Sequence, residues 1–294
     1  METQGFQAVI VGAGRLGLAI ATLMPKSRIK VAALSTRSGA KTDLQSRFPE
    51  SEWLTFNSER PESANRIIEL ARSLIGKSGK VLLFLTVNDD ELANVVSTLA
   101  PPLRGASNLV VFSCSGGKSL EVLAPFLSHQ TEGGILHPCT AVYSDNRTLP
   151  LDGTVTYTWS GTSGATPVAR ELVSSWGGEF VELGEINRVA YHAANVLSAG
   201  HLLTLIESSR KLLTSAGVSQ DATTQILRSL VTSVLRAVEE TNPGVSFASK
   251  LTGPFIRGDE KLIEEHLKVI ASLAPELSEI YRQIGILATR ISEK

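Results

Sequence analysis

The sequence predicts an α/β fold in which a doubly wound sheet is followed by a smaller, all-helical domain. Strand-like and helix-like segments alternate as far as residue 185, and several of the strands are continuously apolar, which is typical of buried parallel strands. From residue 186 the chain reads as helices alone. With 294 residues, 43% of them hydrophobic, the chain can bury two cores. We therefore expect domains at 1–185 and 186–294.

The first element is an apolar strand that breaks into a glycine turn and resumes as a helix. Residues 6–21 read FQAVIVGAGRLGLAIA, with the glycines at Gly12, Gly14 and Gly17. Glycines without Cβ atoms let a pyrophosphate approach the backbone, and the free N–H groups of the helix N-terminus attract it. We interpret the turn as a Rossmann-type dinucleotide site that includes Arg15 and Leu16. An ordinary tight strand–helix turn is the alternative.

The end of the second strand bears on the choice of cofactor. Residues 29–34 read as a strand, and the chain continues with Ser35, Thr36 and Arg37, with no Asp or Glu at this point. An acid here would bind the ribose 2′-OH and repel a 2′-phosphate, whereas a cation flanked by hydroxyls suits the phosphate. The sequence therefore favours NADP over NAD. Alternatively, Arg37 is a solvated loop residue.

The remaining strands of the first domain should end at the same edge. We expect a helix at 39–48, a strand at 53–55, a helix at 61–75, strands at 81–87 and 109–112, a helix through Phe126, strands at 134–136 and 154–159, a helix at 164–176 and a strand at 179–183. Thr86 and Val87 end one strand and should lie against the cofactor. The ends of the next strands bring Ser115, in a Ser-Gly-Gly-Lys-Ser loop, and His137 to this edge.

Ser115 and His137 each have two interpretations. The loop at Ser115 lacks the first glycine of a phosphate-binding P-loop, because Phe112 stands there. Ser115 either forms the floor beside a nicotinamide or only stabilises the turn. His137 is either an acid catalyst or wall of the site, or a hydrogen-bonded structural residue.

In the second domain we expect helices at 187–216, 219–241, 258–273 and 275–291. Apolar residues recur every three or four positions along the first helix, and His192 falls on that stripe with Asn195 beside it. Both polar side chains should face inward, either toward a carbonyl substrate or as satisfied core groups in a bundle or dimer interface. Between two later helices, Arg257 stands in a loop with glycines, a proline and Asp259. It either clamps a substrate carboxylate or pairs with Asp259.

Composition argues against several other classes of function. Lys plus Arg number 28 and Asp plus Glu 29, so there is no bulk basic field for nucleic acid. We expect no membrane segment, because no uninterrupted apolar run approaches about 20 residues. Two isolated cysteines suit a reducing cytoplasm. The histidines lack the spacing of metal ligands, so we expect no metal site.

These motifs resemble a known family of Rossmann-like proteins with a helical C-terminal domain of unknown function, in the β-hydroxyacid dehydrogenase and ketopantoate reductase superfamily. The resemblance spans nearly the whole chain. It rests on the glycine turn, Ser115-Gly116-Gly117, His137-Pro138, residues 191–194 (YHAA), and above all residues 251–254 (LTGP) with Arg257-Gly258-Asp259. It implies an NADP-linked oxidoreductase fold that dimerises through its helical domain. β-Hydroxyacid dehydrogenases use a lysine with an asparagine one turn later, and His192 falls about where that lysine would stand.

We therefore expect a ketopantoate-reductase-like enzyme that uses NADP to reduce a small keto acid or imine acid. His192 would donate the proton, Asn195 would orient the substrate, Arg257 would bind its carboxylate, and Ser115 or His137 would line the opposite wall. The alternative is a non-catalytic NADP-binding sensor or a dimeric interaction protein.

Overall fold

In the computed structural model, described over residues 5–38, 42–76, 79–142 and 155–293, the chain forms two compact units, Met1–Ala199 and Gly200–Lys294. The packing therefore divides the chain after Ala199, whereas the change in composition after residue 185 marks only where strands stop. The intervening helix α6 (Arg188–Val196) belongs to the first unit, with which it makes the hydrogen bonds described below.

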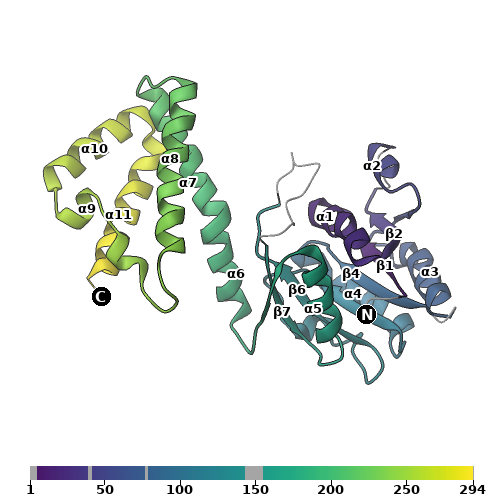
Figure 1. Ribbon diagram of the computed structural model, residues 1–294. Helices are drawn as coiled ribbons and strands as arrows, with labels where there is room; N and C mark the ends of the chain where they lie inside the picture. The colour runs from purple at the N-terminus through teal and green to yellow at the C-terminus, as the bar shows by residue number, and fades with distance from the viewer. Residues whose placement is uncertain (1–4, 39–41, 77–78, 143–154, 294) are drawn as a thin grey trace. The chain divides into compact units, whose positions relative to one another are not determined.

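The described residues of the first unit form a sheet (Figure 1). Its strand order is β3-β2-β1-β4-β5-β6-β7-β8. All neighbouring strands are parallel except β6 and β7, which are antiparallel. The strands are β1 Phe6–Val11, β2 Lys30–Thr36, β3 Glu52–Thr55, β4 Lys80–Leu85, β5 Leu109–Ser113, β6 Glu132–Pro138, β7 Thr156–Gly161 and β8 Glu179–Glu182. The predicted doubly wound α/β fold is confirmed. Residue 154, the predicted start of β7, lies outside the described residues.

Helices cover both faces of this sheet because its central strands are apolar on both sides. Helices α1 (Arg15–Leu23) and α5 (Thr166–Trp176) pack on the face that carries Phe84 and Phe112. Helices α3 (Asn65–Gly76) and α4 (Asp89–Leu103) pack on the face that carries Leu83 and Val111. The rings of Phe84 and Phe112 stack with centroids 4.9 Å apart.

Two predicted helices of this unit are shorter than expected. Helix α2 is Thr42–Arg47, and the predicted start at Gly39 lies outside the described residues. The helix predicted through Phe126 was wrong, because the chain makes only a 3₁₀ turn at Leu120–Leu123. Pro125 contributes to the difference, since it has no backbone N–H with which to continue the helical hydrogen bonds.

The predicted helix over 187–216 is interrupted. After α6 the chain makes a π-helical turn at Leu197–His201 and continues as α7 (Leu202–Ser215). The stripe predicted along it is not buried within the chain, since Val189 is 75% exposed and Leu203 46% exposed. A π turn adds a residue to the helical repeat, so spacing at three and four residues does not define one face across it.

The second unit contains α7, α8 (Gln220–Glu239), α10 (Glu260–Leu273) and α11 (Ser278–Ser292), with a single helical turn, α9 (Pro254–Arg257), inside the predicted loop. An apolar groove of about 660 Å³ lies among them. It is lined by side chains of α7, α8, α10 and α11, including Leu205, Leu230, Val234 and Val269.

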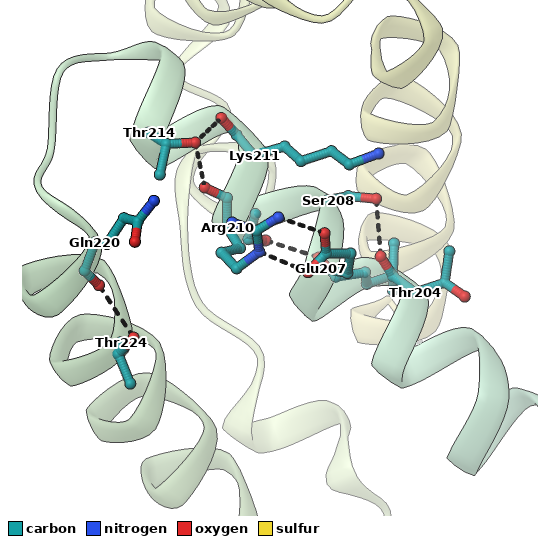
Figure 2. A network of polar contacts seen from close by, with 10 residues as sticks. Thr204, Glu207, Ser208, Arg210, Lys211, Thr214, Gln220 and Thr224 are labelled. Carbon is teal, nitrogen blue, oxygen red and sulfur yellow. Dashed lines mark hydrogen bonds and ion pairs between the residues drawn. The ribbon is translucent and has the colours of Figure 1, made fainter. Parts of the chain in front are cut away.

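Several polar side chains of α7 form hydrogen bonds within the helix. Glu207 receives two hydrogen bonds of 2.7 Å from Arg210, and the Thr214 hydroxyl donates to the carbonyl of Lys211 at 2.8 Å (Figure 2).

The stretch Arg188–Ser215 is long and apolar enough, by length and composition, to cross a membrane. Since a core or interface helix meets the same criterion, this feature does not assign a membrane location.

Candidate active site

The three glycines of the turn have separate structural roles. Gly12 has a φ of 101° and lies so close to Thr86 that a Cβ would come within 2.9 Å of its backbone. A Cβ on Gly17 would lie 2.2 Å from the carbonyl oxygen of Gly12, so this glycine allows the close contact of helix and strand. A Cβ on Gly14 would meet nothing within 4 Å, so its side faces open space. This arrangement suits a turn that packs tightly on one side and receives a pyrophosphate on the other.

The side chains of Arg15 and Leu16 contact other parts of the protein and do not line this open space. Arg15 donates a hydrogen bond to the carbonyl oxygen of Val142 at 3.2 Å, and Leu16 packs against the core. The backbone N–H groups at this helix start are therefore the parts of the turn that suit an anion.

A pocket of about 180 Å³ lies beside the turn. Its lining includes Gly12, Gly14, Ser35, Thr36, Arg37, Ser58, Thr86, Val87 and Glu91. Arg37 forms an ion pair with Glu91, with Nη2 and Oε1 3.0 Å apart. The hydroxyl of Ser58 donates a hydrogen bond to the other oxygen of the same carboxylate. No acidic residue directly follows β2 in the sequence, but α4 places Glu91 beside the end of β2.

The loop after β5 is stabilised by its own serine. The Ser115 hydroxyl accepts a hydrogen bond from the backbone N–H of Lys118 at 3.0 Å, and Ser115 is 8% exposed. This contact is the turn-stabilising role that the sequence left open for Ser115. Its place beside a nicotinamide stays a prediction.

Two imidazole rings meet at Gly116 in this loop. A Cβ on Gly116 would lie 2.7 Å from Nδ1 of His192 and 2.8 Å from Nε2 of His137. The ring centroids are 6.4 Å apart, and the rings are nearly perpendicular at 76°. Nδ1 of His192 is buried and has no hydrogen-bond partner among the described residues. A Cβ on the next residue, Gly117, would lie 2.9 Å from Oδ2 of Asp89. The structure thus brings together two histidines predicted from distant parts of the chain.

His137 is held from its other side by Tyr191 of α6. Nδ1 of His137 lies 2.9 Å from the Tyr191 hydroxyl, which also lies 2.8 Å from Oγ1 of Thr158 and 3.3 Å from Sγ of Cys139. Burial raises the pKa of Tyr191, so the phenol keeps its proton at neutral pH. The sequence did not single out Tyr191 as a site residue, although it stands in the quoted YHAA segment.

The surroundings of His137 keep its imidazole neutral. Burial is the largest cause that lowers its pKa, from 6.5 to about 4, and electrostatic interactions with His192 and Arg188 act in the same direction. The carboxylate of Asp89 opposes them. Arg188 is itself 8% exposed and lies over the Tyr191 ring, 5.6 Å from its centroid.

The other two predicted substrate-binding groups have partners of their own. The side-chain amide of Asn195 donates to the carbonyl oxygen of Tyr191 at 2.9 Å. Arg257, in the second unit, pairs with Asp259, with Nη2 and Oδ2 2.7 Å apart. The pairing of Arg257 with Asp259 is one of the two interpretations that the sequence left open. Among the described residues, no group of three or more His, Cys, Asp or Glu could hold a metal ion.

Comparisons with known proteins match two family models along the chain, and the second match begins inside the first compact unit. Residues 2–138 match the family model of a Rossmann-like domain, and residues 155–287 match that of a domain of unknown function, DUF2520. A search of curated proteins finds no match.

Solved structures share the fold at low identity. A Bacteroides fragilis protein provisionally described as an NADP oxidoreductase is 18% identical, with a TM-score of 0.72 and coverage of 98% of each chain. Pyrroline carboxylate reductase from Plasmodium falciparum, solved with NADP bound, is 13% identical over 97% of this chain and 99% of that chain, with a TM-score of 0.57. An imine reductase from Myxococcus stipitatus in complex with NADP+ is 12% identical over 98% of this chain and 93% of that chain, with a TM-score of 0.57. These similarities show a common fold.

Proposed function

The chain belongs to the proteins that join a Rossmann-like domain to a DUF2520 domain, and on that premise we propose that it is an NADP-dependent reductase of a small keto acid or imine acid, similar to ketopantoate reductase. The observation that carries the proposal is the meeting of His137 and His192 at Gly116. Strands β1, β4 and β5 are parallel neighbours, so Gly116 follows the same sheet edge as the glycine turn. A pair of imidazoles beside a dinucleotide site suits proton-coupled reduction.

The residues at the turn fit NADP. The side of Gly14 is open to a pyrophosphate, and Arg37 with Ser35 and Thr36 brings hydrogen-bond donors for a 2′-phosphate to the pocket. Bound NADPH would supply the hydride. Structures of fold neighbours that contain NADP support this choice.

The chain's own residues would handle the substrate. His192, whose buried Nδ1 has no partner among the described residues, would donate a proton. Asn195 would orient the substrate, and Ser115 and His137 would line the wall opposite. Arg257 would release Asp259 and bind the substrate carboxylate in its place.

A hydride-transfer assay tests this function. Purified protein is incubated with NADPH deuterated at C4 and a panel of 2-keto acids and cyclic imine acids. We expect deuterium to appear on the reduced carbon of at least one compound and His192→Ala to reduce kcat more than it changes KM. Tight NADPH binding without turnover of any compound would contradict the proposal that the protein is an enzyme.

A non-catalytic NADP sensor is the second candidate. The pairing of Asn195 with the Tyr191 carbonyl and of Arg257 with Asp259 favours it, because both expected substrate contacts are already satisfied. Binding without turnover in the same assay would support the sensor.

We further propose a cytoplasmic homodimer formed through the helical unit. Large apolar side chains of that unit are exposed in the single chain, among them Leu230 at 58% and Val234 at 57%. Contiguous apolar surface of this kind marks an interaction site.

A further inference from the structure

The Tyr191 hydroxyl has three neighbours and one hydrogen to give. Thr158, Cys139 and His137 all lie within hydrogen-bond distance of its oxygen. A phenol donates once and accepts twice, so all three contacts can be made only if Tyr191 donates to one neighbour and accepts from the other two.

Thr158 helps to determine which neighbour receives the hydrogen. Its hydroxyl lies 3.4 Å from the backbone carbonyl oxygen of His137, to which it can only donate. A Thr158 hydroxyl that donates there has no hydrogen left for Tyr191 and accepts from it, over 2.8 Å. Both lone pairs of the Tyr191 oxygen then receive hydrogens, one from the Cys139 thiol and one from Nδ1 of His137. This arrangement makes hydrogen bonds of the contacts with Thr158, Cys139 and His137 and of the contact between Thr158 and the His137 carbonyl.

The proton on Nδ1 leaves Nε2 of the neutral His137 ring as a bare acceptor. That nitrogen lies 2.8 Å from the position that a Cβ on Gly116 would occupy, and glycine leaves this position empty. The carboxylate of Asp89 faces the neighbouring Gly117. The loop therefore presents a lone pair and a negative charge on one side, with the ring of His192 on the other.

We infer that Tyr191 is a positioning residue that fixes His137 as a hydrogen-bond acceptor, and that the site takes a protonated imine acid and discriminates against a keto acid. The inference rests on the proposed reductase function and selects between its two substrate classes. An iminium N–H donates to Nε2, and its positive charge is stabilised by Asp89. A ketone oxygen would place its lone pairs against that of Nε2 and lose affinity.

The reaction balances without a proton from His137. Two electrons and a hydrogen pass as hydride from the reduced nicotinamide to the iminium carbon. The C=N π pair becomes the nitrogen lone pair, and the nitrogen keeps its proton, which His192 supplies when the imine arrives neutral. The products are a secondary amine acid and the oxidised nicotinamide. His137 holds the N–H throughout as an acceptor.

Nitrogen NMR of the protein without cofactor tests the position of the proton. The protein has five histidines, and ¹⁵N-labelled histidine distinguishes a protonated Nδ1 from a protonated Nε2. At pH 7 we expect His137 to be protonated on Nδ1, and Tyr191→Phe to shift it toward the Nε2–H form. Tyr281→Phe is the matched control, because Tyr281 makes the same kind of contact with Nδ1 of His266, at 2.7 Å, and should affect only His266. A wild-type His137 protonated on Nε2 would overturn the inference.

Ligand binding tests the substrate class. Pyrrolidine-2-carboxylate, whose ring nitrogen is a positively charged NH2+ group at neutral pH, and tetrahydrofuran-2-carboxylate, whose ring oxygen is neutral and only accepts, share ring size and carboxylate. Each is titrated calorimetrically into protein saturated with NADP+. We expect the amine acid to bind at least about tenfold more tightly, and Tyr191→Phe to remove most of that preference. Equal affinities, or no binding of either compound, would contradict the assigned substrate class.

The two tests separate this inference from the proposed function. If the protein reduces keto acids alone and His137 is protonated on Nε2, the reductase function stands and the inferred preference for imine acids is wrong. Loss of NADPH binding would remove the reductase, whereas the NMR result on cofactor-free protein does not depend on it.

Discussion

At the scale of single residues, Arg37 should determine the preference for NADPH. A guanidinium makes paired, charge-assisted hydrogen bonds to a phosphate, and NADH has no 2′-phosphate to receive them. In a thermal-shift titration, NADPH should raise the Tm of the wild type more than NADH does, and Arg37→Ala should equalise the two. Arg104→Ala, an exposed arginine at the other end of α4, should leave the difference intact. Equal shifts in the wild type would contradict the NADP assignment.

Glu91 should have the opposite effect. Its carboxylate holds Arg37 at 3.0 Å and would repel a 2′-phosphate in the same pocket. Glu91→Gln keeps the shape of the side chain and removes the charge. We expect its Kd for NADPH to fall several-fold while that for NADH changes little, as measured by fluorescence titration at two salt concentrations. A weaker NADPH complex would instead show that Glu91 positions Arg37.

His137 should make the first unit less stable in acid. Its pKa is about 4 in the folded protein, below the 6.5 of the free side chain, so the unfolded chain binds the extra proton between those values. Stability from this residue is present above pH 6.5 and is lost as the pH falls toward 4, by about 2 to 3 kcal/mol. Urea unfolding at pH 7.5 and 4.5 measures the loss, and His137→Gln should show a smaller one. An equal loss in both proteins would contradict the lowered pKa.

At the scale of elements, two glycines of one turn should respond differently to the same change. Gly17→Ala places a Cβ 2.2 Å from a backbone oxygen and should cost about 2 kcal/mol or more, seen as a lower Tm. Gly14→Ala meets nothing within 4 Å, so its Tm should stay near that of the wild type. Its Kd for NADPH should rise at least about tenfold, because the methyl group occupies the approach of the pyrophosphate. A normal NADPH affinity in Gly14→Ala would place the cofactor elsewhere.

Regular elements were predictable because their signals are local. The apolar run of β4 and the glycine turn before α1 each specify a structure within a few residues. The π-helical turn at Leu197–His201 was not predictable, since its sequence continues an ordinary helical pattern. Pro125 could have warned against the helix predicted through Phe126.

At the scale of the whole molecule, the helical unit should dimerise through its exposed apolar groove. Leu230 and Val234 line the groove and are more than half exposed, so replacing them with glutamate would bury charge in any interface. We expect a dimer for the wild type and a monomer for the Leu230→Glu, Val234→Glu double variant in sedimentation experiments. Thr232→Glu, on the same helix and absent from the groove lining, is the matched control. A monomeric wild type would contradict the proposal.

The candidate site was only partly predictable, because its contacts join residues far apart in the chain. His137 and His192 were both found from the sequence, but their meeting at Gly116 depends on the whole sheet. Tyr191 escaped notice because its three partners lie 33 to 54 residues away. Glu91 likewise reaches the pocket from α4, although the rule that suggested NADP considers only the end of β2.

The antiparallel strand β7 has a consequence for how such proteins diversify. It returns Thr158 beside His137, so the partners of the Tyr191 hydroxyl all come from residues 137–191, whereas the lining of the cofactor pocket comes from residues 12–95. The two sets share no residue. Inherited changes within residues 12–95 can therefore alter the choice of nucleotide while residues 137–191 keep their hydrogen-bond pattern. Recombination between residues 95 and 137 would exchange the two stretches independently.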